Sequence, residues 1–459
     1  MRPDTSLLKY CRSKNSEEAL KYVTEEPSYV SYDGKTALIL ACINGLQEVA
    51  LELLKSEESI PNHIDDNNGT ALSYACENEM YEVIVELMKY DSVNLDHVDC
   101  NENTPLTLCC SSRNEELEEI AIQLIESGKC NLAHKDELNQ TPLMIAITSE
   151  FIELSKKLIS SGEAEISYVD EQGNTALILA CENSLDEIAL LLLEEEDCNV
   201  DAIDENTDSA LSIACYNDLS TVCTKILSIC TSDSEYINAI DTMGKTPLIW
   251  LCKYGNIEAL NILFENHIDV LDITINDDKD NNALHYSVKN SKLDDISCRM
   301  IDINPNLLLK PNQRGETPFN VICTNDKTVL IDKIINKINY EEYIPVLLQH
   351  KMYKKVMELL KENESPIRKF VLDLLNCTDL ISLLDILLDK DKIKELNIKL
   401  DSVKEGSHDC LICFNSTYLC YLIQPCRHIL TIDFNCISRL SQCPICRKEI
   451  EEKFQVYLT

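Results

Sequence analysis

The chain has 459 residues, more than one compact hydrophobic core usually holds. Its 79 Asp and Glu residues outnumber its 41 Lys and Arg residues, and the formal net charge of -38 counts against nucleic-acid binding, which needs concentrated positive charge. The best apolar run, residues 380–388, is too short for a bilayer and contains Asp385, and the N-terminus has no signal-peptide core. We therefore expect a soluble, intracellular, cytoplasmic protein with no nucleic-acid partner and no membrane partner.

The apolar pattern of residues 1–30 predicts two short helices. Each helix has one apolar face, formed by Leu7, Leu8 and Cys11 in the first and by Ala19, Leu20 and Val23 in the second. These faces are too small to fold alone. We therefore expect residues 1–30 to be a degenerate unit that caps the repeats after it.

From residue 31 to residue 325, a pattern of Thr, then Pro or Ala, then Leu returns about nine times. It reads D33-G-K-T-A-L-I-L-A-C42 at its first occurrence and N101-E-N-T-P-L-T-L-C-C110 at its third. We call the Thr position of each copy the anchor residue, and successive anchors are 34 to 37 residues apart. The anchors are Thr36, Thr70, Thr104, Thr141, Thr175, Ser209, Thr246, Asn282 and Thr317. A period of this length indicates stacked repeats.

The pattern resembles the ankyrin repeat, whose unit of about 33 residues has a turn, an inner helix that begins with T-P-L-H-x-A, and an outer helix. The resemblance implies an all-α ankyrin-repeat solenoid that binds a protein. The residue chemistry agrees, because the Thr hydroxyl can cap free backbone N–H groups and Pro fits the first helical turn. The outer helix is marked by Val49, Leu51, Leu53 and Leu54 in the first repeat and by Ile188, Leu190, Leu191, Leu192 and Leu193 in the fifth.

Many of the 23 cysteines follow the same register. Seven lie six residues after an anchor, and Cys11 holds the matching place in the first unit: Cys42, Cys76, Cys110, Cys181, Cys215, Cys252 and Cys323. Neighbouring helices pack about 8 to 10 Å apart, whereas a disulfide needs Cα atoms within about 7 Å. We therefore expect buried, reduced thiols. Trp250 lies at an apolar inner-helix position and should be in the core, and His285 at the T-P-L-H histidine position should be structural.

Between residues 326 and 400 the anchor pattern disappears while helical periodicity continues. Apolar residues recur within 344–348, 356–360 and 371–375. We interpret this segment as degenerate helical repeats that close the stack, followed by a linker. The charged run from Asp389 to Asp409 predicts a solvated helix end and a hinge.

Residues 401–459 contain a cluster of zinc-ligand residues. Two C-x2-C pairs, Cys410 with Cys413 and Cys443 with Cys446, flank a middle group of Cys426, His428 and Cys436. Each pair can place two sulfurs on one tetrahedral zinc ion at about 2.3 Å. Because so short a segment cannot bury a sufficient core, we expect two structural Zn²⁺ ions in an interleaved arrangement. A disulfide set, which leaves His428 without a role, and a bare zinc knuckle are the alternatives.

The cluster resembles a RING finger through C410-L-I-C413, P425-C426-R-H428 and C443-P-I-C446-R447. The resemblance implies that Cys410, Cys413 and Cys436 bind one ion and that Cys426, His428, Cys443 and Cys446 bind the other. The family expects one more Cys or His three residues before Cys436, where this chain has Asp433. Asp433 is our candidate because a carboxylate can bind zinc, and a site completed by water or left empty is the alternative. Thr431 fits the commoner spacing but is a poor ligand, and Cys420 should be a buried strand thiol.

Four further residues match those that RING ubiquitin ligases use. Ile412, Leu440 and Pro444 match the apolar patch that binds a ubiquitin-conjugating enzyme, and Arg447 matches the linchpin arginine that contacts both this enzyme and its ubiquitin. The resemblance implies a RING-type E3 ubiquitin transferase without a covalent intermediate, in which the ankyrin repeats recruit a substrate protein. The alternative is a non-catalytic interaction scaffold with an inactive RING. The combination is also similar to ankyrin-RING proteins of giant DNA viruses, which implies the host cytoplasm.

The thirteen residues from Arg447 to the end are too apolar for a frayed terminus. Phe454, Val456 and Leu458 alternate as in a β-strand, and a strand needs a partner. The tail resembles that of inhibitor-of-apoptosis RINGs, which dimerise through it, and Tyr457 matches their aromatic residue that contacts ubiquitin on the opposite protomer. We therefore expect a RING homodimer. The alternative is a tail that packs only on its own zinc module.

Overall fold

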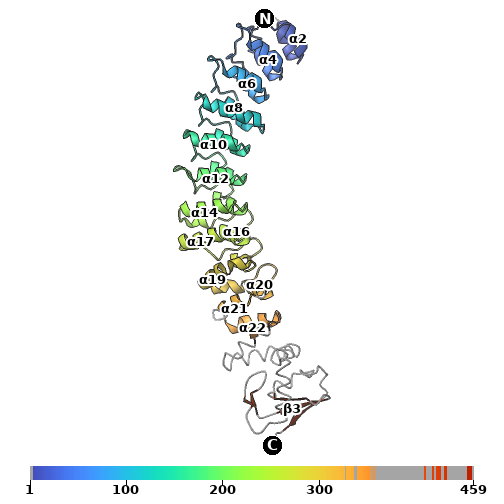
Figure 1. Cartoon of the computed structure of the whole chain (residues 1–459), viewed down its shortest axis with the longest axis vertical. Helices are drawn as coiled ribbons and strands as arrows, with labels where there is room; N and C mark the ends of the chain where they lie inside the picture. Colours follow the sequence, from blue (N-terminus) through green and yellow to red (C-terminus); the bar gives the residue numbers. More distant parts are fainter. Residues whose placement is uncertain are drawn as a thin grey trace. The chain divides into compact units, whose positions relative to one another are not determined.

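The computed structural model describes residues 4–325, 327–334, 339–352, 355–356, 408–409, 416–417, 420–424, 428–431 and 452–456 (Figure 1). The chain divides into two compact units, Met1–Asp272 and Ile273–Thr459. The described part of each unit is mainly helical, and its helices are consecutive in the sequence.

Two columns of helices make up the first unit. The inner column contains α1 (Ser6–Arg12), α3 (Ala37–Ile43), α5 (Ala71–Glu77), α7 (Pro105–Ser111), α9 (Pro142–Thr148), α11 (Ala176–Glu182), α13 (Ala210–Tyr216) and α16 (Pro247–Tyr254). The outer column contains α2 (Ser16–Lys21), α4 (Gln47–Leu54), α6 (Tyr81–Met88), α8 (Glu115–Glu126), α10 (Ile152–Ser161), α12 (Asp186–Leu192), α14 (Ser220–Ile229) and α17 (Ile257–Asn266). Each helix contacts the next helix of its own column as well as its partner in the other column, so every repeat is buried by its neighbours.

The inner helices begin where the anchor residues predicted. At all nine anchors the residue is the N-cap, and its side-chain oxygen accepts a hydrogen bond from the backbone N–H three residues later. Thr70, Thr104, Ser209 and Asn282 also form a reciprocal capping box. Four of the helices have Pro at the first position: Pro105, Pro142, Pro247 and Pro318.

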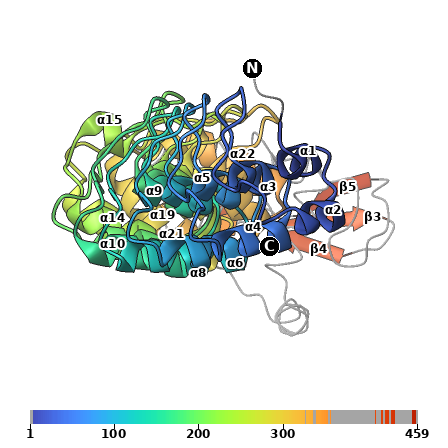
Figure 2. The same cartoon turned by 90° about the horizontal axis from the view of Figure 1, so that it is seen from above.

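In most repeats, the tight turn before the inner helix is held by an aspartate that the sequence analysis did not single out. In seven repeats an Asp lies five residues before the anchor, and one oxygen accepts the backbone N–H groups two and four residues later: Asp65, Asp99, Asp136, Asp170, Asp204, Asp241 and Asp277. The residue two before the anchor has positive φ, as at Gly173 with φ 83°. In Figure 2 these turns gather along one side of the inner helices, opposite the outer column.

The core contains the residues that the register predicted. The cysteines six residues after the anchors, and Cys11, are all buried free thiols. Trp250 is only 2% exposed, which confirms its core position. His285 is buried within a capping box, with Nδ1 2.9 Å from Asn282 Oδ1 and Nε2 3.1 Å from the Glu316 carbonyl oxygen, so its predicted structural role is confirmed.

The second unit continues the helical pattern. Its helices are α18 (Ala283–Ser287), η1 (Ser291–Leu293), α19 (Asp294–Ile303), η2 (Pro305–Leu309), α20 (Pro318–Thr324), α21 (Thr328–Ile334) and α22 (Tyr340–Gln349). The periodicity at 344–348 thus marks a helix, α22, whereas 357–360 and 371–375 lie outside the described residues.

Five short strands are described after residue 400. Strand β1 (His408–Asp409) pairs with β2 (Ser416–Thr417) in antiparallel orientation. A second sheet has the order β4-β3-β5, formed by β4 (His428–Thr431), β3 (Cys420–Gln424) and β5 (Glu452–Val456). Cys420 lies in β3 as predicted, opposite Thr431 on one side and Val456 on the other.

The strand predicted in the tail is therefore confirmed over Glu452–Val456, but its described partner is β3 of the same chain. This pairing satisfies one edge of β5 without a second protomer. The argument that the strand needs another chain as its partner is thereby removed, and the RING homodimer stays a prediction.

Candidate functional site

Most of the zinc ligands and enzyme-binding residues predicted from the sequence lie outside the described residues. They are Cys410, Cys413, Cys426, Asp433, Cys436, Cys443 and Cys446, together with Ile412, Leu440, Pro444, Arg447 and Tyr457. His428 is described as the first residue of β4, with its Cα opposite that of Ile423. In the parts of the chain that the structure covers, no group of three or more His, Cys, Asp or Glu side chains is placed to hold a metal ion.

A pocket lies between three successive repeats of the first unit, on the face made by the inner helices and their turns. We call it the acidic pocket. Its volume is about 360 Å³. It is lined by Glu182 at the end of α11, by Asp208 before α13, by Ser212, Ile213, Tyr216 and Asn217 on or just after α13, and by Asp241, Thr242 and Met243 in the next turn.

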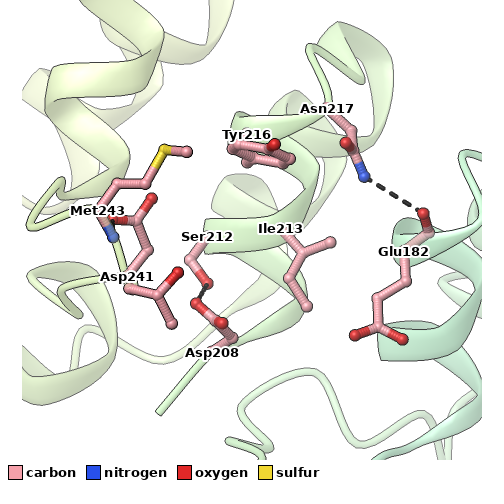
Figure 3. A pocket seen from close by; sticks show the side chains of 9 residues that line it. Glu182, Asp208, Ser212, Ile213, Tyr216, Asn217, Asp241 and Met243 are labelled. Carbon is pink, nitrogen blue, oxygen red and sulfur yellow. Dashed lines mark hydrogen bonds between the residues drawn. The ribbon is translucent and has the colours of Figure 1, made fainter. Parts of the chain in front are cut away.

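The middle repeat forms the floor of the acidic pocket. Figure 3 shows Ile213 and Tyr216 between Glu182 on one side and Asp241 with Met243 on the other. Ile213 is 9% exposed, whereas Tyr216 and Met243 are 45% and 44% exposed. The pocket therefore has an apolar floor, and its carboxylates come from three different repeats.

Hydrogen bonds to the fold fix the walls of the pocket. Asn217 Nδ2 donates to the carbonyl oxygens of Cys181 at 2.9 Å and Glu182 at 3.5 Å, which ties α13 to the end of α11. Trp250 Nε1 donates to Asp241 Oδ2 at 2.6 Å, and the other oxygen of Asp241 closes the turn. Asp241 is thus held in place by the core.

An aromatic cluster supports the same wall. The rings of Tyr216 and Trp250 form an edge-to-face pair with centroids 5.2 Å apart, and Tyr254 stacks on Trp250 with ring centroids 5.5 Å apart. Lys245 and Lys253 place their ammonium groups 4.7 Å and 4.0 Å from the centroid of the indole. Neither lysine lines the pocket.

The charge of the acidic pocket is negative and uncompensated by its own lining, which includes no Lys, Arg or His. Burial raises the pKa of Glu182 above its ordinary value, and the carboxylates of Asp204, Asp208 and Asp170 raise it further. Burial also raises the pKa of Asp208, with Asp204 and Asp241 adding to the effect and the Ser212 hydroxyl opposing it. These directions show that negative charge is crowded here.

The sequence analysis missed this pocket, although the repeat register contains a signal for it. Seven residues after the anchor, Glu182 and Tyr216 stand where other repeats have Ser111 or Thr148. One residue before the anchor, Asp208 replaces the Asn174 of the preceding repeat. Because Glu77 also lies seven residues after its anchor, the signal is the combination of Glu182, Asp208 and Tyr216 in two neighbouring repeats and not any one of these residues.

A family model for ankyrin repeats, in three copies, matches residues 58–136, 116–204 and 211–306, which together make up more than half of the chain. The chain belongs to the ankyrin-repeat family. No curated protein sequence matches it. Ankyrin repeats generally mediate binding to protein partners, so the acidic pocket of this ankyrin-repeat protein lies among elements whose usual role is protein recognition.

No helix within the described ranges is both long enough and apolar enough to cross a membrane. The ankyrin repeats of the first unit carry surface charge instead, with exposed ion pairs such as Lys55 with Glu52 and Lys89 with Glu86 along the outer helices.

Proposed function

We propose that this ankyrin-repeat protein is a RING-type E3 ubiquitin-protein ligase. The observation that carries the proposal is the spacing of the seven Cys and His ligands between Cys410 and Cys446, together with the match of Ile412, Leu440, Pro444 and Arg447 to residues that such ligases use. The described strands support a small module here, because β1 ends directly before Cys410 and the β3–β4 pair flanks Cys426. The ankyrin repeats supply the protein-binding surface that a ligase needs for its substrate.

Zinc in this proposal is structural. Cys410, Cys413, Asp433 and Cys436 would hold one ion, and Cys426, His428, Cys443 and Cys446 the other. Metal binding supplies the folding free energy that so short a segment lacks.

Atomic absorption should return two zinc ions per chain. Cys443→Ser should abolish zinc binding at its own site while the helical circular dichroism of the repeats remains, and Asp433→Ala should weaken only the first site. One ion per chain in the unmodified protein would contradict the interleaved arrangement.

Chemistry in the proposed ligase takes place between two other proteins. The ε-amine of a substrate lysine attacks the thioester carbonyl that joins ubiquitin to the conjugating enzyme, the enzyme's cysteine thiolate leaves, and an isopeptide bond forms. This chain supplies proximity, because the repeats hold the substrate and the module holds the conjugating enzyme. Arg447 would donate hydrogen bonds to both the enzyme and ubiquitin and so restrict the thioester to a reactive orientation.

Autoubiquitination of the purified full-length protein with a panel of conjugating enzymes tests the proposal. We expect ubiquitin chains with at least one enzyme of the panel. Ile412→Ala should remove binding of the conjugating enzyme, whereas Arg447→Ala should leave binding nearly intact and slow the discharge of preloaded ubiquitin at least tenfold. Lys448, the next residue, offers a control, because Lys448→Ala removes the same charge beside Arg447.

The second candidate function is a non-catalytic interaction scaffold with an inactive zinc-binding RING. The family match favours protein binding and by itself requires no transfer chemistry. Two zinc ions per chain, combined with no ubiquitin transfer across the whole panel, would establish the scaffold and reject the ligase.

A further inference from the structure

We propose that the acidic pocket binds an arginine side chain from an extended, basic segment of a partner protein. This inference deepens the proposed function, because such a segment would identify the class of substrate that the repeats recruit. It depends on the ligase proposal only for that consequence, since binding to the pocket needs no ubiquitin transfer.

The first argument is charge complementarity. Glu182, Asp208 and Asp241 come from three successive repeats and line one cavity that has no basic residue in its lining. Burial and mutual repulsion disfavour ionisation of Glu182 and Asp208, so a cation that enters the pocket relieves an unfavourable interaction of the free protein. The formal net charge of the chain, -38, also favours the approach of a basic segment.

The second argument is the apolar part of the pocket, which a simple cation would not use. The exposed ring of Tyr216 lies over the floor formed by Ile213, and the side chain of Met243 closes one end (Figure 3). A planar guanidinium can stack on a tyrosine ring and hydrogen-bond a carboxylate through two N–H groups at once. Its aliphatic stem would cover Ile213 and Met243. Lysine offers only a point charge and fits this combination less well.

The third argument concerns what lies around the pocket. Three exposed apolar side chains of the same repeats flank it in the sequence: Ile203 is 42% exposed, Ile240 47% and Tyr254 42%. A segment that runs along the turns could therefore place apolar residues on either side of its arginine. Exposed apolar side chains on the repeats that carry the pocket can add contact area with a bound segment.

The lysines of the aromatic cluster do not neutralise the carboxylates from within the pocket, because neither lysine lines it. Lys245 and Lys253 lie over the ring of Trp250 and occupy its face, while neither lines the cavity. A guanidinium that enters the pocket can therefore stack on the exposed ring of Tyr216 but not on the indole of Trp250. The edge-to-face contact with the buried Trp250 holds the ring of Tyr216 in place.

Peptide selection on the full-length protein tests the proposal. The probe is a phage-displayed library of random twelve-residue peptides, selected on the unmodified chain and counter-selected on the double variant Glu182→Gln/Asp208→Asn. Both substitutions suit the fold, because Asn174 occupies the register position of Asp208 in the preceding repeat and Gln keeps the shape of Glu. We expect enrichment of peptides that contain arginine between apolar residues.

Fluorescence polarisation of the enriched peptides then measures the contribution of each group. The double variant should bind about 10- to 100-fold more weakly, as should a peptide with citrulline in place of arginine. Tyr216→Ser should weaken binding about tenfold, because it removes the ring on which the guanidinium stacks. The substitution suits the fold, since Ser111 holds the same register position in another repeat. Glu77→Gln is the matched control: Glu77 also ends its inner helix seven residues after the anchor, and burial also raises its pKa, yet it lies outside the pocket.

Four outcomes of the peptide experiments would overturn the inference. They are a library that enriches nothing, enriched peptides without basic residues, binding that is equal in the unmodified protein and the double variant, and an equal loss of binding in Glu77→Gln. Calcium binding that depends on Glu182 and Asp208 without any peptide binding would likewise replace the peptide site with a cation site. Because all these measurements omit ubiquitin, an inactive RING leaves them unchanged and is distinguished from a failure of the pocket.

Discussion

The anchor residues show how much structure one side chain can specify. Eight of the nine anchors are almost fully buried, Thr317 being the exception, and the oxygen of each satisfies a backbone N–H that would otherwise have no partner at the start of an inner helix. Thr, Ser and Asn all serve, because each offers a short side-chain oxygen. The side-chain oxygen is therefore the required feature and the methyl group of Thr is secondary.

Thr175 offers a test of this requirement. In the native protein, the buried N–H of Ile178 donates to Thr175 Oγ1 at 3.2 Å. Thr175→Ala leaves this N–H without a partner. We expect the free energy of unfolding to fall by about 1 to 2 kcal/mol. Thr175→Ser, which copies Ser209, should cost less than half of that. Urea denaturation followed by circular dichroism measures both, and equal losses would show that packing of the methyl group matters more than the cap.

Two aspartates of the turns have opposite electrostatic environments. Burial alone would raise the pKa of Asp65, but the Lys35 ammonium at 2.5 Å, the N–H of Gly69 and the Tyr74 hydroxyl lower it below its ordinary value. The pKa of Asp208 is raised instead, as described above. Ionised Asp65 therefore stabilises the fold and ionised Asp208 destabilises it.

Substitution by asparagine should separate the two cases at neutral pH. Asp65→Asn should lower the free energy of unfolding by about 1 to 3 kcal/mol, and Asp208→Asn should raise it by about 0.5 kcal/mol. The effect of Asp65→Asn should vanish as the pH falls from about 4 through the lowered pKa of Asp65. The stabilising effect of Asp208→Asn should vanish at a higher pH, as the pH falls through the raised pKa of Asp208 toward about 4. Urea titrations between pH 3 and 7 measure both, and effects of the same sign would contradict these environments.

At the level of elements, the starts of the inner helices could be predicted and the variation between repeats could not. The step from Thr104 to Thr141 is 37 residues, and the structure uses the added residues to lengthen the outer helix α8 to 12 residues, against 8 in α6. The equally long step from Ser209 to Thr246 instead adds the short helix α15 (Ser234–Ile237). Sequence spacing reveals an insertion but does not determine which element receives it.

The short helix α15 is held by contacts that the repeat pattern does not contain. Asp233 caps it, and the buried Tyr236 donates its hydroxyl to the Val200 carbonyl oxygen at 2.9 Å. The acidic pocket has the same origin, because it depends on side chains from three repeats rather than on a property shared by all of them. Features common to every repeat could be predicted from one sequence, whereas these individual features needed coordinates.

The cysteine register leads to a prediction about the inner helices as elements. Burial raises the pKa of Cys11 and of Cys323 to about 12 and raises that of Cys42 further still, so little reactive thiolate exists at neutral pH. Cys100 lies in an exposed turn. Brief treatment of the native protein with iodoacetamide, followed by peptide mass spectrometry, should label Cys100 and spare Cys42. Both should react in urea, and rapid native labelling of Cys42 would show that the inner column opens.

For the molecule as a whole, the contact pattern keeps perturbations local. Within the first unit, each helix contacts its partner and the adjacent helices of its own column, so a change in one repeat acts mainly through its neighbours. We expect substitutions in the repeats of the first unit to leave the proposed zinc binding after residue 400 unchanged. The division expected from the sequence follows its motifs, because the anchor pattern ends near Cys323 and the zinc-ligand pattern begins at Cys410, whereas the two compact units of the structure divide after Asp272.

The C-terminal tail permits the last prediction. Strand β5 ends at Val456 and pairs with β3 of its own chain, so deletion of residues 457–459 leaves every described strand pair intact. If the proposed ligase acts as a RING homodimer in which Tyr457 contacts the ubiquitin of the opposite protomer, the deletion should preserve zinc content and binding of the conjugating enzyme while ubiquitin discharge falls at least tenfold. Tyr457→Phe keeps the ring and should retain most activity. Sedimentation of the full-length protein should show a dimer, and a monomer that discharges ubiquitin at the normal rate after the deletion would mean that the tail serves only its own sheet.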